Sequence, residues 1–180
     1  MINEKSMTLA TDYSGQDVTG WIASEKLDGC RAYWDGAALW TRGGNAIEAP
    51  AWFTAAFPQC HLDGEIWAGR GNFEKARRAV QYGQFGTEVS CPVKFMAFDV
   101  PEAKGNWLQR MYSERDRLWS EHAEKVGSIG AIRIQQNVSE WCKAIVSGGG
   151  EGLILRNPAV TTYEKGRTPN LIRVKPEFLR

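Results

Sequence analysis

The stretch SEKLDGCRAYWDG, residues 24–36, places a lysine two positions before an Asp-Gly pair and five positions before an arginine. Two Asp-Gly pairs, which favour tight turns, separate three strand-like runs, at residues 21–26, 30–34 and 38–42. This spacing predicts an antiparallel meander. Side chains alternate across a strand, so Arg31 and Tyr33 are expected on one face and Lys26 at a strand end beside the turn.

A lysine in such a turn can act as a nucleophile only when its amine is neutral. Its unperturbed pKa is ~10.4, and a nearby fixed cation favours the neutral form because it makes a second positive charge unfavourable. The turn at Asp28 and Gly29 is expected to return Arg31 toward Lys26, and the Arg31 guanidinium is also suited to binding a phosphate. Taken alone, however, the stretch is better explained as a hairpin with a solvated lysine and arginine.

The rest of the chain mixes the two kinds of periodicity. Apolar residues recur at helical spacing in residues 50–57, 72–82, 106–124 and 139–147. Strand-like runs occupy residues 61–67, 93–100, 131–138, 152–157 and 171–175. Because strands often follow one another directly, we predict an α+β fold with antiparallel sheets flanked by helices, in one globular domain.

Composition excludes several classes of protein. The 180 residues contain 22 Lys and Arg against 21 Asp and Glu, a formal net charge of +1, so any nucleic-acid surface must be a local patch. The four cysteines include no CxxC pair, which argues against a zinc site and a disulfide framework. No run is apolar and long enough for a signal-peptide core or a membrane span, so we expect a cytoplasmic protein with no membrane partner, although a removed leader would leave no trace.

Four further stretches place charged or aromatic residues in settings similar to the first. They are LDGE at 62–65, FMAFD at 95–99, EG at 151–152 and RVK at 173–175. Together with the lysine they supply an amine, a pair of carboxylates, a stacking ring and a phosphate clamp. Nucleotidyl transfer needs these parts, because its catalysis consists mostly of positioning and charge neutralisation.

Six motifs in order carry a resemblance to a known family. KLDGCR, TRGG, LDGE, FMAFD, EGLIL and RVK resemble motifs I, Ia, III, IIIa, IV and V of the covalent nucleotidyltransferases, specifically ATP-dependent DNA ligases. The flanking residues are most similar to the minimal bacterial ATP-dependent DNA ligases, and the resemblance covers residues 21–176. It implies the ATP-grasp-like catalytic fold of DNA ligases and mRNA capping enzymes, with residues 1–180 as the nucleotidyltransferase (adenylation) domain and the family's C-terminal OB-fold domain absent.

The resemblance implies four catalytic residues. Lys26 would form the covalent lysyl-AMP, Asp28 and Arg31 would support its site, and Lys175 would meet the α-phosphate. Arg173 departs from the family pattern, in which a lysine is usual. It keeps the charge but changes the geometry, so its role in nucleotide binding is left open.

Base, sugar and metal contacts are implied in the same way. Phe98 would stack on the adenine, and Arg42 would contact the sugar or the phosphates. Glu65 would hold the ribose hydroxyls, and with Glu151 it would bind the divalent metal. Glu25, next to the reactive lysine, is expected among the nucleotide-contacting residues.

The implied cofactors are ATP and Mg²⁺. We expect ATP rather than NAD, because the 25 residues before Lys26 are too few for the extra domain of the NAD-dependent ligases. The implied partner is nicked double-stranded DNA, bound by a monomer. Basic residues that are candidates for a DNA surface are Arg42, Arg70, Lys75, Arg77 and Arg78, although such clusters are more often a solvated helix face.

Two alternatives remain open from the sequence. The KxDGxR motif is shared with RNA ligases and GTP-using capping enzymes, although the flanking residues argue against them. A non-catalytic module that binds nucleotide or DNA ends is the second alternative. Intact Lys26, Glu65 and Glu151 argue against this module, and the absence of motif VI argues for it.

Overall fold

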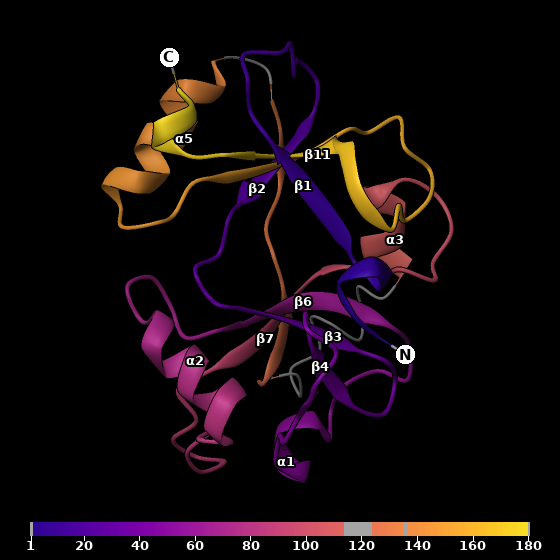
Figure 1. The fold of residues 1–180 in the computed structure, drawn as a ribbon, viewed down its shortest axis with the longest axis vertical. Helices are drawn as coiled ribbons and strands as arrows, with labels where there is room; N and C mark the ends of the chain where they lie inside the picture. Colours follow the sequence, from indigo (N-terminus) through magenta and orange to yellow (C-terminus); the bar gives the residue numbers. More distant parts are fainter. Residues whose placement is uncertain (1, 114–123, 135–136, 180) are drawn as a thin grey trace.

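Two β-sheets, one above the other in Figure 1, form the framework of the molecule. The structure is a computed structural model that describes residues 2–113, 124–134 and 137–179. The five-stranded sheet has the order β1-β11-β10-β2-β9, formed by β1 (Thr8–Asp12), β2 (Ile22–Glu25), β9 (Ile132–Arg133), β10 (Leu153–Arg156) and β11 (Gly166–Val174). The six-stranded sheet has the order β5-β4-β3-β6-β7-β8, formed by β3 (Cys30–Trp34), β4 (Leu39–Thr41), β5 (Ala46–Ile47), β6 (Leu62–Trp67), β7 (Lys94–Asp99) and β8 (Val126–Ser128).

Short helices surround these sheets, with α1, α2 and α5 on their outer sides and α3 beside the space between them (Figure 1). The α-helices are α1 (Ala51–Thr54), α2 (Phe73–Tyr82), α3 (Trp107–Ser113) and α5 (Val138–Ser147), and the 3₁₀ turns are η1 (Glu4–Ser6) and η2 (Pro176–Phe178). Helix α2 ends at Gly83, which is left-handed with φ 64° and returns its N–H to the carbonyl of Ala79. Helix α5 begins at Asn137, whose side chain accepts the N–H of Ser139. In the described residues, no helix is long and apolar enough to cross a membrane.

Alternation along the strands gives the six-stranded sheet one apolar and one polar face. Its apolar face forms a core with α1 and α2 through Ala32, Trp34, Leu62, Ile66, Phe95 and Ala97. Residues one position out of phase, Arg31, Glu65 and Phe98, line a cavity on the opposite face. Strand alternation therefore explains both why the motif residues face the cavity and why their sequence neighbours are buried in the core.

The five-stranded sheet repeats this arrangement with α5. Leu153 and Leu155 of β10 and Ile172 and Val174 of β11 form a second core, to which α5 contributes Val138 and Cys142. The out-of-phase residues Ile154, Arg156 and Arg173 line the same cavity as the polar face of the other sheet. Each sheet thus has its own core and contributes its polar face to one shared space.

The predicted α+β class is confirmed, and most strand pairs are antiparallel as predicted. Each sheet also has one parallel pair, β1 with β11 and β7 with β8. Strand β1 was not predicted, because TLATD has no strong alternating pattern. The predicted helix at 106–124 begins as α3, and its residues 114–123 lie outside the described part of the chain.

The predicted meander is wrong at its first turn. Strands β2 and β3 belong to different sheets, so Asp28-Gly29 lies in a crossing between the sheets rather than in a hairpin. The N–H of Lys26 donates to the carbonyl of Gly152 (2.9 Å), which keeps the end of β2 beside β10. Gly29 already lies against β6, where an added Cβ would be 2.4 Å from the carbonyl oxygen of Ile66. An Asp-Gly pair has the same local signature in both settings.

The glycine of LDGE provides a test of the packing between β6 and β7. A Cβ on Gly64 would lie 2.5 Å from the Phe95 ring and 2.7 Å from the carbonyl oxygen of Met96. We expect Gly64→Ala to destabilise the protein by about 1–3 kcal/mol, the usual cost of overpacking, measured by urea unfolding. Gly130→Ala is the control, because a Cβ there meets no atom within 4 Å. Equal midpoints for the two variants would contradict the packing described.

Candidate functional site

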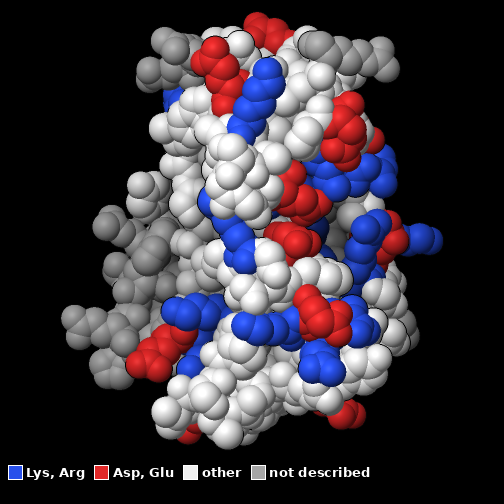
Figure 2. Space-filling model, turned by 90° about the vertical axis from the view of Figure 1, so that its left-hand side faces the viewer, with Lys and Arg blue, Asp and Glu red and all other residues white. Residues whose placement is uncertain are grey.

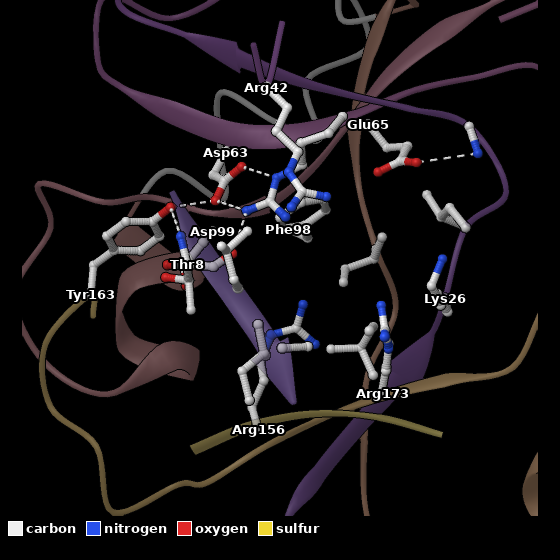
Figure 3. A pocket seen from close by; sticks show the side chains of 18 of the residues that line it. Thr8, Lys26, Arg42, Asp63, Glu65, Phe98, Asp99, Arg156, Tyr163 and Arg173 are labelled. Atoms are coloured by element: carbon white, nitrogen blue, oxygen red, sulfur yellow. Dashed lines mark hydrogen bonds and ion pairs between the residues drawn. The ribbon is translucent and has the colours of Figure 1, made fainter. Parts of the chain in front are cut away.

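A cavity of about 890 Å³ lies between the polar faces of the two sheets (Figure 3). The expected site residues that line it are Glu25, Lys26, Arg31, Arg42, Glu65, Phe98 and Arg173. Glu151 and Lys175 are joined to this lining through an ion pair of Glu151 with Lys26. Asp28 is the exception. It is outside the lining, and its carboxylate makes no hydrogen bond or ion pair within the described residues.

Strand register brings two lysines to one carboxylate. On β10, Leu153 lies opposite Glu25 of β2 on one side and Val174 of β11 on the other. Both neighbours run antiparallel to β10, so Lys26 and Lys175, one residue further along, lie on either side of the chain just before Leu153. Glu151 accepts hydrogen bonds there from both amines, with Lys175 Nζ 2.7 Å from its Oε1.

This shared carboxylate is ionised in spite of its surroundings. Burial by itself would raise the pKa of Glu151, but the hydrogen bonds from Lys175 and Lys26 outweigh burial and hold the pKa below its ordinary value. The hydrogen bond to Glu151 raises the pKa of Lys175, whose ammonium group is therefore a stable cation. The three side chains are each about one quarter exposed, so the cluster is open to a ligand from the cavity.

Glu65 lines the cavity from β6 of the six-stranded sheet, whereas Lys26 lines it from the end of β2 of the other sheet (Figure 3). Burial raises its pKa to about 7, although the charges of Arg31 and Lys26 and a hydrogen bond from the N–H of Gly29 (3.2 Å) act in the opposite direction. A carboxyl that titrates near neutrality in a cavity is typical of functional sites. Glu65 is opposite Arg31 in the register of β3 and β6.

Arg31 is held by a network that reaches the N-terminal strand. Its guanidinium donates to Asp63 through Nε (2.6 Å) and Nη2 (2.5 Å) and to the carbonyl of Thr8 (3.0 Å). Burial by itself would lower the pKa of Arg31, but the Asp63 carboxylate raises it above its ordinary value. Tyr163 donates its hydroxyl to Asp63 and accepts the N–H of Thr8 (2.9 Å). Arg31 therefore has one orientation, fixed from three different elements.

The same guanidinium lies over the ring of Phe98, with Cζ 4.7 Å from the ring centre. Helix α3 holds the backbone of Phe98, because the indole N–H of Trp107 donates to its carbonyl (2.6 Å). The next residue, Asp99, accepts two hydrogen bonds from the buried Arg110, at 2.7 and 2.9 Å. These contacts fix the plane of the ring at the cavity wall.

Sequence reasoning missed a buried cation in this cavity. Arg156 of β10 is 7% exposed, donates to Ser24 (2.7 Å) and lies over the ring of Trp107, with Cζ 4.6 Å from its centre. No ion pair to it occurs among the described residues, and burial lowers its pKa to about 10. Its position directly after EGLIL was the available signal, because the residue faces the same side of β10 as Ile154. Asp63 was predicted only as one of the two carboxylates of LDGE, and its pairing with Arg31 was not foreseen. Tyr163 was missed because its partners are distant in sequence.

The remaining expected contacts are already paired in this structure. Arg42 forms an exposed ion pair with Glu4, and Arg173 pairs with Asp12 of β1. Arg70 binds Glu25 (2.7 Å).

The candidate DNA surface is dispersed. Arg77 and Arg78 both pair with Glu74 on α2, as on a solvated helix face. Figure 2 shows Lys and Arg side chains interleaved with carboxylates on the face that it presents, rather than gathered in one basic patch.

The described residues contain no complete set of protein ligands for a metal ion. Within the described residues, no group of three or more His, Cys, Asp or Glu side chains is arranged to hold a metal ion. The two expected carboxylates, Glu65 and Glu151, match the usual protein share of a magnesium site, in which one or two carboxylates are completed by substrate phosphates and water.

Several known proteins are similar to this chain in sequence or in fold. No protein-family profile matches the chain. A DNA ligase of Haemophilus influenzae is 32% identical over 175 residues, which are 96% of this chain and 64% of that protein. A structure from a structure–function analysis of Lig E DNA ligases is 34% identical with a TM-score of 0.85, over 94% of this chain and 68% of that one. The Chlorella virus DNA ligase–adenylate, at 18% identity, shares the fold with a TM-score of 0.73 over 97% of this chain and 68% of that one.

The raised pKa of Glu65 predicts a pH-dependent stability. The pKa of Glu65 is 4.5 in the unfolded chain and about 7 in the folded protein. At pH values between these two, the folded protein binds more protons than the unfolded chain, so Glu65 makes the free energy of unfolding fall as pH rises. Above pH 7, Glu65→Gln removes that cost while its amide oxygen can still accept the Gly29 N–H. We expect the variant to be more stable than wild type by on the order of 3 kcal/mol at pH 8.5, and to match it below pH 4.5.

Urea unfolding at the two pH values measures this difference. Glu88→Gln is the control, because Glu88 is exposed in a loop and its replacement is expected to change stability equally little at both. A Glu65→Gln effect that is the same at pH 4.5 and pH 8.5 would exclude the buried, neutralised carboxyl.

Proposed function

This chain belongs to the DNA ligase family, and we propose that it transfers AMP from ATP to Lys26 and from there to the 5′-phosphate of a DNA nick. The observation that carries the proposal is the single carboxylate, Glu151, between two lysines at the edge of a nucleotide-sized cavity. The chain spans 64% of the length of the Haemophilus ligase.

The first step uses the two lysines differently. The Lys26 amine gives up a proton to water and leaves its hydrogen bond with Glu151, and its lone pair attacks the α-phosphorus of ATP. A bond forms between Nζ and phosphorus, the bond from phosphorus to the bridging oxygen of the β-phosphate breaks, and pyrophosphate leaves with that electron pair. The nitrogen then loses a second proton to water, which gives the neutral phosphoramidate nitrogen of lysyl-AMP. Lys175 remains an ammonium ion beside the α-phosphate, where it offsets the charge that develops in the transition state.

Magnesium would be held by Glu65 and Glu151 together with phosphate oxygens, and when bound it would neutralise the charge of the leaving pyrophosphate. Glu65 binds a cation only as the carboxylate, so its pKa of about 7 favours metal binding at neutral to basic pH. Glu151 is ionised already, and a ligand that engages it releases Lys26. The two carboxylates thus link nucleotide binding to the freeing of the nucleophile.

The adenine would stack on Phe98. Arg31 covers one face of this ring at 4.7 Å, which leaves the other face for a base. Arg31 and Arg156 supply positive charge on opposite walls of the cavity, suited to a polyanionic ligand. ATP is proposed over GTP because one protein of the same fold, the Chlorella virus ligase, is a ligase–adenylate.

DNA would bind over the cavity mouth as the second substrate. The candidate basic residues Arg42, Arg77 and Arg78 form ion pairs with side chains that are more than a quarter exposed. Exposed pairs contribute only ~0–1 kcal/mol each, so phosphates can replace their carboxylates at little cost. After AMP passes to the 5′-phosphate, the neighbouring 3′-hydroxyl would displace it and seal the strand.

Replacement of the nucleophile tests the first step. With ATP and Mg²⁺, we expect wild type to gain the mass of one AMP and Lys26→Ala to gain none, because the other amine at the shared carboxylate, Lys175, is held as an ammonium ion by its hydrogen bond to Glu151. Intact-mass spectrometry measures the adduct. Lys75→Ala, at an exposed position on α2, is the matched control and should label as wild type does. An adduct on Lys26→Ala would refute the assignment.

Replacement of the stacking ring tests the base contact. We expect Phe98→Ala and Phe98→Leu both to weaken ATP binding by ~1–3 kcal/mol, because base–aromatic stacking contributes about that much. Leucine retains apolar packing but has no ring, so loss of affinity in both variants separates stacking from packing. Calorimetric titration measures the affinity, and Tyr82→Ala, which removes an exposed ring on α2, is the control. Normal affinity with Phe98→Leu would leave Phe98 a purely structural role.

A further inference from the structure

Arg70 connects the two sheets at the end of the cavity where Lys26 lies. It follows β6 of the six-stranded sheet, and its guanidinium binds Glu25, the last residue of β2 in the five-stranded sheet, through Nε and Nη2, both at 2.7 Å. Its third donor, Nη1, binds the carbonyl of Gly148 at 2.9 Å. One side chain thus holds the residue before the nucleophile and the end of α5.

The segment from Gly148 to Gly152 is shaped around this contact. A Cβ on Gly148 would lie 2.7 Å from Arg70 Nη1, and a Cβ on Gly150 would lie 2.9 Å from Glu25 Oε1. The N–H of Gly150 returns to the carbonyl of Ile145 (2.9 Å), which folds the segment back on α5. The next residue is Glu151, so the position of its carboxylate depends on how this segment is held.

The energetics of the contact point to geometry rather than stability. The ion pair is partly exposed, 38% for the side chain of Arg70 and 24% for that of Glu25, and such pairs stabilise a fold by only ~0–1 kcal/mol. The two parallel bonds from guanidinium to carboxylate, in contrast, fix the relative orientation of both groups. Arg70 takes no part in the ion pairs of Lys26 and Lys175, and it does not line the cavity.

We propose that Arg70 is a positioning residue for the transfer of AMP to Lys26. Through Glu25 and Gly148 it holds the end of β2 and the glycine-rich segment in register, and this keeps Glu151 between Lys26 and Lys175. The inference rests on the proposed function. It differs from the sequence-based expectation that Arg70 contributes to a DNA surface, because it gives Arg70 an effect in the absence of DNA.

Single-turnover formation of the AMP adduct without DNA, over a series of ATP concentrations, tests the inference. We expect Arg70→Ala to lower the maximal rate about 10- to 100-fold, the usual cost of a misplaced reacting group, and to change the half-saturating ATP concentration less than threefold. Arg70→Lys keeps the charge but not the paired geometry, so it should recover only part of the rate. Arg133→Ala is the matched control, because Arg133 is an exposed arginine on β9 that donates to a backbone carbonyl, that of Gly20, and lies outside the cavity lining.

A coupling measurement separates positioning from general destabilisation. If Arg70 acts through Glu25, then Glu25→Gln lowers the rate as well, and the double variant is no slower than the slower single variant. Arg70→Ala should also keep the thermal midpoint of wild type within a few degrees. The inference would be overturned if the rate loss of the double variant were the product of the two single losses, or if the rate fell in parallel with the thermal midpoint.

Failure of the inference is distinguishable from failure of the proposed function. If wild type forms no adduct with ATP and Mg²⁺, the proposed function is refuted, and the role of Arg70 with it. If wild type forms the adduct and Arg70→Ala matches its rate without DNA, only the inference is refuted. A defect of Arg70→Ala confined to nick sealing would likewise refute it and return Arg70 to the DNA surface.

Discussion

Two ammonium groups that share one carboxylate place the strongest constraint on this structure. Glu151 stays ionised in a partly buried position only because Lys26 and Lys175 both donate to it. Those lysines directly follow β2 and β11, which are the two neighbours of β10 in the five-stranded sheet. The strand order and the antiparallel register are therefore requirements of the charge arrangement, since a shift of one residue would point a lysine into the second core.

A cavity with so many charges needs them to be paired across long distances in sequence. The pair formed by Arg31 and Asp63 is completed by Thr8 and Tyr163, which lie on β1 and on the segment before β11. The pair formed by Asp99 and Arg110 similarly connects β7 to α3. Each pair satisfies a group that would be costly to bury alone, and each also fixes a side chain at the cavity wall. Stability and organisation of the site have the same source here.

Local pattern predicted those parts of the fold in which sequence neighbours decide the structure. The strand at 30–34 was predicted with its observed bounds, and alternation placed Arg31 opposite the buried Ala32 and Trp34. The crossing at 28–29 was mistaken for a hairpin, because the choice between the two depends on packing of Gly29 against β6. Strand β1 was missed since it pairs with β11, more than 150 residues away.

The candidate site was predictable to the extent that motif order carried it. Lys26, Glu65 and Phe98 all line one cavity as expected, yet each was assigned through resemblance rather than through local chemistry. Tyr163 gave no local signal, because its partner Asp63 is 100 residues away in sequence, and the only signal for Arg156 was its position directly after EGLIL, since its partner Ser24 is 132 residues away. The register of β10 with β2 and β11 brings the Glu151 carboxylate between the two lysines, and no single motif encodes this register.

The parallel pairing of β1 with β11 also sets the order in which the chain can acquire its structure during synthesis. All strands of the six-stranded sheet lie between residues 30 and 128, so that layer is complete in sequence while the strands at 153–156 and 166–174 are still to be made. Strand β1 precedes the other described strands in the sequence, but its partner β11 follows all of them. Until β11 has been synthesised, the hydrogen-bonding edge of β1 is open, and the five-stranded sheet, whose strand β2 leads into Lys26, cannot be completed before the six-stranded one.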